Sequence, residues 1–244
     1  MKKISSFILF YLISTTSFSL PKGFVYLHDV APDIVQDMRY ATNNNFIGNP
    51  IPGYQRGVCI ITRKAAERLK KAEEYIQTKG YTLKVYDCYR PQRSVNYFYK
   101  WSQNTKDQRM KPEFYPRERK QNLFKRHYID LTSGHTRGST IDLTLVKLGT
   151  SREKNSTNSH LIRCYDKNPN YLDDDSIDMG TRFDCLDVSA NIDYSNLSKD
   201  QKMNRKLLQN LMTRFGFKPY YYEWWHFTLN NEPYPNTYFN FPVQ

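Results

Sequence analysis

Apolar residues recur at helical spacing in three stretches of the chain. Residues 62–79 carry them at intervals of three and four, which predicts an amphipathic helix that ends at Gly80. Residues 199–215 repeat this pattern before Gly216, and residues 94–101 begin a further helix. These stretches predict helices that bury one face against a core.

Other stretches follow a strand pattern or no regular period. Residues 81–86 and 140–146 alternate or run apolar, and residues 217–229 are rich in aromatic side chains, so we expect strands there. Residues 24–54 contain turn signals and are expected to be loop-like. Residues 104–127 are charged and poor in aliphatic side chains, so we expect them to run over the surface.

This order of elements predicts an α+β fold with a mostly antiparallel central sheet and flanking helices. The chain has 244 residues, shows no internal repeat and contains no linker rich in Pro, Gly or Ser, which indicates one domain. Residues 147–178 are polar without a clear period, and we interpret them as an insertion that forms a lid or an ordered loop.

The N-terminal residues are typical of an export signal. Two lysines follow the first Met, residues 4–13 are mostly apolar, and the small residues Ser17 and Ser19 suit a cleavage site. We therefore predict a signal peptide over 1–19 and an exported mature domain over 20–244, periplasmic or secreted. A membrane anchor is the alternative, but the apolar run is short for a span, so no stable anchor is expected after processing.

Charge and cysteine content narrow the functional classes. The formal net charge is +12, but Lys and Arg are spread along the chain, and their densest cluster, residues 117–126, is interrupted by other residue types. We therefore expect no nucleic-acid partner. The four cysteines allow three disulfide connectivities, of which Cys164–Cys185 is favoured because it would staple the polar segment. No C-x-x-C spacing indicates a thiolate zinc site.

Two imidazoles and two carboxylates are the candidates for chemistry. His135 lies in a predicted turn, Asp142 on the following strand, and Glu223 and His226 three positions apart far downstream. On a flat strand, Glu223 and His226 would point to opposite faces, so we predict a bend there. The plainer interpretation is a surface His with a hydrogen-bonded Asp, and Glu223 in a salt bridge.

If these side chains converge, they fit metal-assisted hydrolysis. His135, Asp142 and His226 would hold one zinc ion with a position left open, and Glu223 would act as the base. Arg90, at the end of a predicted strand, could stabilise an oxyanion. Asp184 could hold a substrate ammonium. The alternative for Arg90 is an ordinary ion pair, and the alternative for Asp184 is to cap a turn.

Several separated motifs match one family in the same order. They are Asp37-Met38-Arg39-Tyr40-Ala41-Thr42, Asn45-Phe46-x-Gly48, Tyr89-Arg90-Pro91, Ser133-x-His135-x-x-Gly138-x-x-x-Asp142, Met179-Gly180-Thr181-Arg182-Phe183-Asp184, Glu223-Trp224-Trp225-His226 and Glu232-Pro233-Tyr234-Pro235-Asn236. The chain thus resembles the zinc metallopeptidases with the hedgehog/D,D-peptidase fold, and within them the D-alanyl-D-alanine dipeptidases of the vancomycin-resistance type. The resemblance runs from about residue 37 to residue 243.

The resemblance implies one Zn²⁺ per chain on the three ligands named above, with Glu223 as general base and Arg90 stabilising the transition state. It adds Ser133, which with Asp184 would fix the amino end of the substrate. Thr140 departs from the family, which usually has Ala there, and so does the long segment 147–178.

The expected function is therefore hydrolysis of D-Ala-D-Ala, or of a related small peptide, in cell-wall turnover. Two alternatives remain open. The first is a D,D-carboxypeptidase or endopeptidase that acts on longer wall peptides with the same metal. The second is a zinc-containing binding protein without catalysis, although the presence of Glu223 argues against it.

Overall fold

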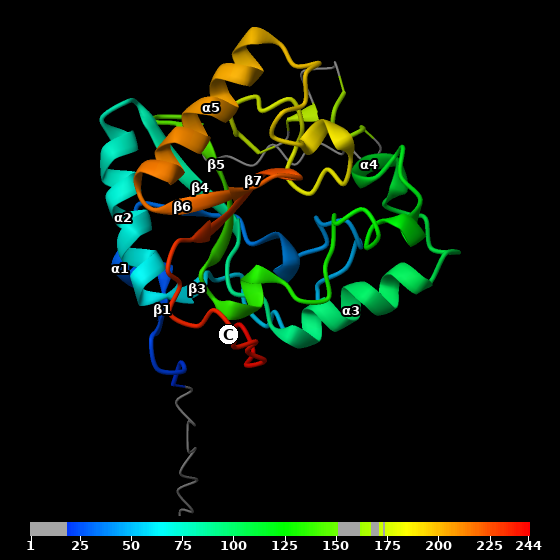
Figure 1. Ribbon diagram of the computed structural model, residues 1–244, viewed down its shortest axis with the longest axis horizontal. Coiled ribbons are helices and arrows are strands. Elements are labelled where there is room, and N and C mark those ends of the chain that lie inside the picture. Colours follow the sequence, from blue (N-terminus) through cyan, green and yellow to red (C-terminus); the bar gives the residue numbers. More distant parts are fainter. Residues whose placement is uncertain (1–18, 151–161, 167–170, 173) are drawn as a thin grey trace, which may run out of the picture.

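A five-stranded sheet in the order β2-β4-β5-β7-β6 forms the centre of the molecule (Figure 1). The computed structural model describes residues 19–150, 162–166, 171–172 and 174–244. The strands are β2 (Val35–Gln36), β4 (Tyr81–Asp87), β5 (Thr140–Lys147), β6 (Phe217–Tyr220) and β7 (Glu223–Leu229). Only β2 pairs in parallel within this sheet, and the other three pairings are antiparallel. The predicted α+β fold with a mostly antiparallel sheet is confirmed.

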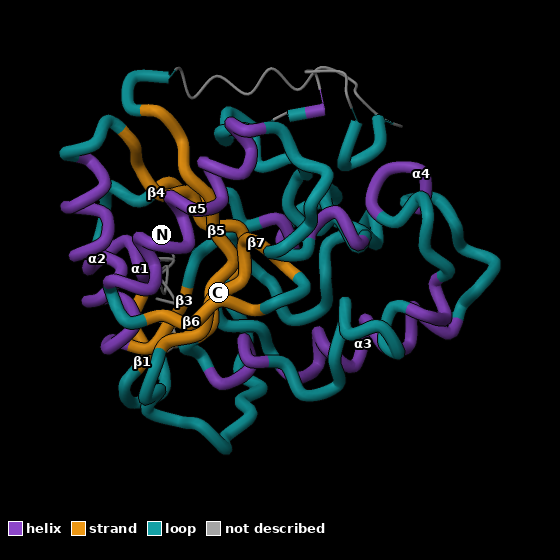
Figure 2. Tube along the Cα trace, turned by 45° about the horizontal axis from the view of Figure 1, so that its top comes forward, coloured by secondary structure: helices purple, strands orange, loops and turns teal. Residues whose placement is uncertain are grey.

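Two of the three longer helices pack against the strands. α2 (Arg63–Gln77) and α5 (Lys199–Arg214) contact each other and the strands, whereas α3 (Gln92–Gln103) lies away from them in both views (Figures 1 and 2). α2 buries the face predicted from the sequence: Ala65, Ala66, Leu69, Ala72 and Ile76. α5 begins with a capping box in which Ser198 and Gln201 bond reciprocally. The three predicted helices are confirmed.

Shorter elements fill the N-terminal region and the connections. β1 (Phe24–Tyr26) pairs with β3 (Ile60–Thr62) in a separate two-stranded sheet. The short helices are α1 (Leu27–Val30), η1 (Arg39–Ala41), α4 (Lys111–Phe114), η2 (Lys120–Asn122), η3 (Gly134–Arg137) and η5 (Val188–Ala190). The prediction that residues 24–54 are only loop was therefore wrong, because elements of two to four residues are too short to show a period.

Most of residues 104–127 are exposed or partly exposed, as predicted, but a few of them are part of the interior. Lys120 is almost completely buried, and its Nζ donates to the carbonyls of Asn104 at 3.0 Å and Asp107 at 2.6 Å. The same ammonium lies 3.9 Å from the ring centroid of Trp101. Three apolar side chains of this segment are also buried, Phe114, Tyr115 and Leu123, and Met110 and Phe124 are partly buried. A charged side chain can be buried when it donates hydrogen bonds to carbonyl groups and lies against an aromatic ring.

Both disulfides are formed, Cys59–Cys88 and Cys164–Cys185. The favoured pairing of Cys164 with Cys185 is confirmed. It ties the polar segment to the chain beyond Met179, and Ser176 in the same segment forms a β-bridge with Val146. The other disulfide, Cys59–Cys88, is buried in the core and joins the residue before β3 to the residue after β4.

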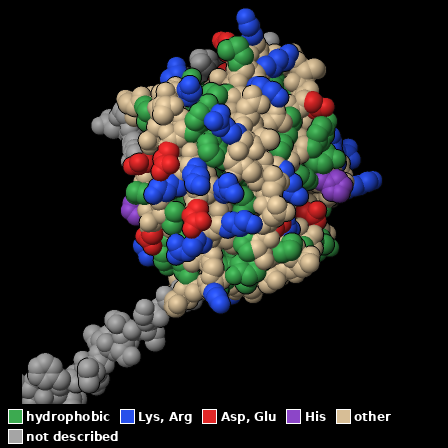
Figure 3. Space-filling model, turned by 60° about the vertical axis from the view of Figure 1, so that its left-hand side comes forward, with side chains coloured by type: hydrophobic (Ala, Val, Ile, Leu, Met, Phe, Trp, Pro, Cys, Tyr) green, Lys and Arg blue, Asp and Glu red, His purple; other side chains and the backbone are tan. Residues whose placement is uncertain are grey.

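Figure 3 shows Lys and Arg side chains distributed over one face with acidic side chains among them. No helix in the described part of the chain combines the length and apolar character needed to cross a bilayer. The predicted signal peptide, apart from Ser19, and much of the polar segment 147–178 lie outside the described residues.

Candidate active site

Asp142 and His226 face each other across β5 and β7. The strands pair so that Asp142 lies directly opposite His226. Ile141 and Leu143, on either side of Asp142, are fully buried on the other face of β5. The alternation seen in the sequence therefore turns the carboxylate toward the imidazole, and His226 Nδ1 lies 3.2 Å from Asp142 Oδ1.

His135 reaches the same point from the turn that precedes β5. It lies in η3, where Ser133 Oγ accepts a bond from the His135 backbone N–H at 3.3 Å. Gly138 ends the turn with φ of 81°, and a Cβ there would lie 2.2 Å from the ring of Phe24, so only glycine fits. The ring Nδ1 donates to the carbonyl of Cys88 at 2.7 Å. Because Nδ1 carries the proton of this hydrogen bond, the free lone pair of the ring lies on Nε2.

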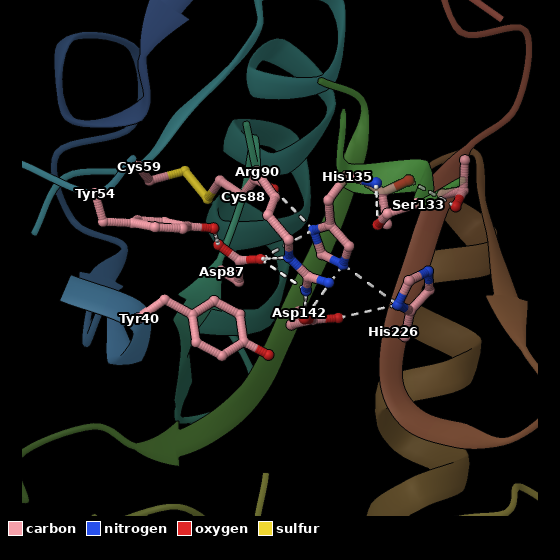
Figure 4. A network of polar contacts seen from close by, with 12 residues as sticks. Tyr40, Tyr54, Cys59, Asp87, Cys88, Arg90, Ser133, His135, Asp142 and His226 are labelled. Carbon is pink, nitrogen blue, oxygen red and sulfur yellow. Dashed lines mark hydrogen bonds and ion pairs between the residues drawn. A yellow bond between two sulfur atoms is a disulfide. The ribbon is translucent and has the colours of Figure 1, made fainter. Parts of the chain in front are cut away.

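Three potential ligand atoms converge as a result (Figure 4). His135 Nε2 lies 3.2 Å from Asp142 Oδ2 and 3.3 Å from His226 Nδ1. Although His226 is close, Asp142 Oδ1 has no hydrogen-bond donor of suitable geometry among the described residues. Two imidazoles and a carboxylate that turn lone pairs toward one point form a donor set suited to a divalent metal ion.

The charges around this point favour a cation. Burial lowers the pKa of His226, but the carboxylates of Asp142 and Glu223 outweigh burial and raise this pKa to about 9. Burial raises the pKa of Asp142, but His135 and His226 outweigh it and hold this pKa well below its usual range. The field that makes His226 hold a proton also attracts a metal ion, which competes for the same lone pair.

Glu223 reaches the site through an irregularity in the β6–β7 hairpin. The register shifts from Pro219↔Phe227 to Tyr220↔Glu223, so β7 has three more residues than β6 between these pairs. The predicted bend is thus present. It brings Glu223 Oε2 to 3.2 Å from His226 Nδ1, although the two residues are three positions apart on one strand.

Arg90 lies beside the potential ligands and is fixed from several sides. Its Nε donates to Asp87 Oδ2 at 2.9 Å, and its terminal nitrogen lies 3.6 Å from Asp142 Oδ2. The guanidinium stands 5.0 Å from the ring centroid of Tyr40 and 5.2 Å from that of Phe98. A buried, held guanidinium can stabilise a developing negative charge without first reorganising.

Asp184 is a buried carboxylate with only part of its hydrogen bonding satisfied. Tyr40 donates to Oδ1 at 3.1 Å, whereas Oδ2 has no donor among the described residues. Burial and the negative charge of Asp142 raise the pKa of Asp184 well above its usual value, despite the opposing effect of Arg90. Such a carboxylate favours a cationic group brought by a ligand.

Comparison with known proteins supplies the family. A family model described as D-Ala-D-Ala dipeptidase matches residues 21–155 and 167–244. The chain belongs to this family of metallopeptidases. It is similar to the D-alanyl-D-alanine dipeptidase of Enterococcus faecium, at 35% identity over 91% of this chain and 98% of that protein. The enzyme of the same name from Streptomyces coelicolor is 34% identical over 90% of this chain and 98% of that protein. The one from Enterococcus faecalis is 33% identical over 92% of this chain and 100% of that protein.

All the predicted site residues of this D-Ala-D-Ala dipeptidase family member lie in one region. The structure brings together His135, Asp142, His226 and Glu223, with Arg90 beside them. Asp184 acts on this group electrostatically, and Ser133 caps the turn that carries His135. The individual roles of these residues stay predictions.

The sequence reasoning missed Asp87 and Tyr54. Asp87 is fully buried, accepts from Tyr54 at 2.6 Å and from Arg90, and lies 3.5 Å from His135 Nδ1. A carboxylate three positions before Arg90, at the end of a strand, was the available signal. It was weak, because most such pairs are surface salt bridges.

Proposed function

We propose that this chain hydrolyses the D-Ala-D-Ala dipeptide to D-alanine with one zinc ion. The convergence of His135, Asp142 and His226, with Glu223 and Asp184 beside them, carries the proposal. The substrate is supported by full-length relatives that are D-alanyl-D-alanine dipeptidases.

Zinc fits the donor set and its spacing. His135 Nε2 lies 3.3 Å from His226 Nδ1, and these two nitrogens lie 3.2 Å from different oxygens of Asp142, Oδ2 and Oδ1 respectively. With one ligand atom taken from each residue, the three atoms lie within 4.8 Å of one another. Ligands held about 2.0–2.1 Å from zinc at the corners of a tetrahedron would be roughly 3.3 Å apart. Asp142 Oδ1, which is buried and has no donor of suitable geometry among the described residues, is the atom that a cation would complete. When bound, zinc would polarise the peptide carbonyl and make a water more acidic.

Glu223 handles the proton in this proposal. Its carboxylate reaches the potential ligands without belonging to the group of three, so it can accept a proton from the attacking water and deliver it to the leaving amine. Arg90 stabilises the oxyanion that forms at the carbonyl, because its guanidinium is held beside Asp142.

Asp184 and Ser133 recognise the amino end of the dipeptide. Asp184 Oδ2 would accept the substrate ammonium, which neutralises a charge that burial otherwise makes unfavourable. Ser133 Oγ, next to His135, can accept a second bond. A dipeptide with a blocked amino end would leave Asp184 unpaired, and this discriminates strongly against longer or modified substrates.

We place the enzyme outside the cytoplasm, in turnover of cell-wall peptides. The signal-peptide pattern supports export, and two disulfides fit an oxidising compartment. Free dipeptide released from the wall would then be the substrate that it meets.

Metal content and a substrate panel test the proposal together. The purified protein is expected to hold about one zinc per chain, by elemental analysis, and to cleave D-Ala-D-Ala in preference to L,D- and L,L-dipeptides. A pentapeptide ending in D-Ala-D-Ala should resist cleavage. Cleavage of the pentapeptide alone would establish the carboxypeptidase alternative. Bound zinc without cleavage of any peptide would establish the binding protein.

A further inference from the structure

Cys88 provides the backbone group that orients His135. The Cys88 carbonyl accepts from His135 Nδ1 at 2.7 Å, and the next residues add a second link because the Arg90 N–H donates to the His135 carbonyl at 3.3 Å. Ring and backbone of His135 are thus both held by the chain that follows β4. The direction of Nε2 depends on where Cys88 lies.

The sheet alone holds this position weakly. The β4–β5 ladder shifts register between Val85 and Asp87, and its last pair is Asp87 with Asp142. Cys88 therefore lies just past an irregular ladder end, where backbone pairing constrains the chain least. The Tyr89 N–H, which donates to the Ile60 carbonyl at 2.9 Å, is one remaining backbone tie.

The disulfide partner is firmly placed. Cys59 is fully buried, its N–H donates to Gln36 Oε1 at 2.9 Å, and its carbonyl accepts from the Leu27 N–H at 2.9 Å. β3 begins at the next residue and pairs with β1. The sulfur bridge in Figure 4 therefore connects the residue that orients His135 to a second, independent sheet.

We propose that the Cys59–Cys88 disulfide is a positioning cross-link for the metal ligand His135, so that metal affinity depends on this bond. The inference rests on the proposed zinc site. Removing the disulfide keeps the Cys88 carbonyl as a hydrogen-bond acceptor but no longer fixes its position. His135 Nε2 is then no longer directed at the metal site. Loss of an outer partner of a metal-ligating His typically weakens metal binding about 10- to 100-fold.

The second disulfide is a matched control. Cys164–Cys185 closes a similar length of chain, with a sequence separation of 21 against 29 for Cys59–Cys88. Its backbone hydrogen bonds involve Glu113, Arg182 and Asp187, and none of the three potential metal ligands. Removal of either bond should lower Tm by a similar amount, so a difference in metal affinity is separate from general stability.

The experiment compares three forms of the full chain: wild type, C59A/C88A and C164A/C185A. Zinc affinity is measured by competition with a chromophoric chelator, and the visible spectrum of the cobalt-loaded protein reports ligand geometry. We expect C59A/C88A to bind zinc about tenfold more weakly, at the lower end of the typical range because the Tyr89–Ile60 bond remains, and its cobalt spectrum to change. C164A/C185A should match wild type in both.

Equal zinc affinity and equal cobalt spectra in C59A/C88A and wild type would overturn the inference, as would the same loss in both variants. Wild type that binds no metal would instead overturn the proposed function. If C59A/C88A does not fold, cobalt-loaded wild type is reduced stepwise while its circular dichroism stays native. Cobalt should leave in step with alkylation of Cys59 and Cys88, and its retention after their alkylation would refute the inference.

Discussion

The active site and a second buried cluster of charge differ in how completely their charges are paired. The Asp174 cluster consists of Asp37, Arg39, Lys84, Tyr86 and Asp174. Both regions bury carboxylates from distant parts of the chain beside an Arg and a Tyr. The contrast lies in what completes each carboxylate.

In the Asp174 cluster, the protein itself supplies the partners. Asp174 Oδ2 accepts from Arg39 at 3.0 Å and from Tyr86, and Oδ1 accepts from the Ser176 N–H at 3.1 Å. Burial raises the pKa of Asp174, but Lys84 and Arg39 outweigh burial and lower this pKa to about 2. The completed cluster attaches the chain at Asp174 to β4, which is a structural task.

In the active site, two carboxylates remain incomplete. Asp142 Oδ1 and Asp184 Oδ2 have no hydrogen-bond donor of suitable geometry among the described residues, and the pKa of Asp184 is raised by burial and by Asp142. Unsatisfied buried oxygens cost stability unless something arrives to complete them. The comparison suggests that a metal ion completes the first and a substrate ammonium the second, so mutations in the two regions should have separable effects.

The largest expected effect is on catalysis at Glu223. Glu223→Gln keeps the size of the side chain but removes the base, so kcat should fall about 10²- to 10⁴-fold. Zinc content should stay at the wild-type level, because Glu223 is not one of the three ligands. Steady-state kinetics with elemental analysis of the same sample checks both, and unchanged turnover would refute the role of Glu223.

Arg90→Ala should act next most strongly and mainly on kcat. Removal of one oxyanion-stabilising group typically costs about 10²–10³ in rate. KM should change far less, because the guanidinium acts on charge that develops in the transition state. Circular dichroism must first show a native fold, since the buried carboxylate of Asp87 loses its charged partner Arg90. An effect confined to KM would move Arg90 to substrate binding.

The same contrast explains what the sequence could predict. His135, Asp142, Glu223 and His226 were found because metal ligands need particular residue types. The Asp174 cluster was not found, because its residues are ordinary charges and meet only through tertiary packing. Asp87 could not be predicted as a site residue for the same reason. Long helices showed their period, whereas the short elements before β3 and the buried position of Lys120 depend on contacts that no local pattern contains.

Asp184→Asn should weaken recognition of the free amino end. Loss of a charge-assisted hydrogen bond costs about 1.5–3 kcal/mol, so kcat/KM for D-Ala-D-Ala should fall roughly 10- to 100-fold. The N-acetylated dipeptide is the control substrate, because it has no ammonium to lose. The ratio of kcat/KM between the free and acetylated dipeptides should shrink, and an unchanged ratio would exclude Asp184 from recognition.

Asp174→Asn should lower stability and leave catalysis intact. The side chain keeps its shape but loses the charge that pairs with Lys84 and Arg39. A drop in pKa from 3.8 to about 2 corresponds to about 2 kcal/mol of unfolding free energy near neutral pH. Urea denaturation at pH 7 measures this difference. A loss of kcat in folded protein would show that the two regions are coupled.

The smallest expected effect is the pH dependence of the difference in unfolding free energy between wild type and Asp174→Asn. Because folding lowers the pKa of Asp174, its contribution is fully present above its unfolded value of 3.8 and is lost as pH falls toward about 2. Other carboxylates titrate in the same range, but they do so in both proteins. The difference in unfolding free energy between wild type and Asp174→Asn should therefore shrink from about 2 kcal/mol at pH 5 toward a much smaller value near pH 2. A difference that stays constant over this range would mean that Asn disturbs packing, and that charge pairing is not what distinguishes the Asp174 cluster from the active site.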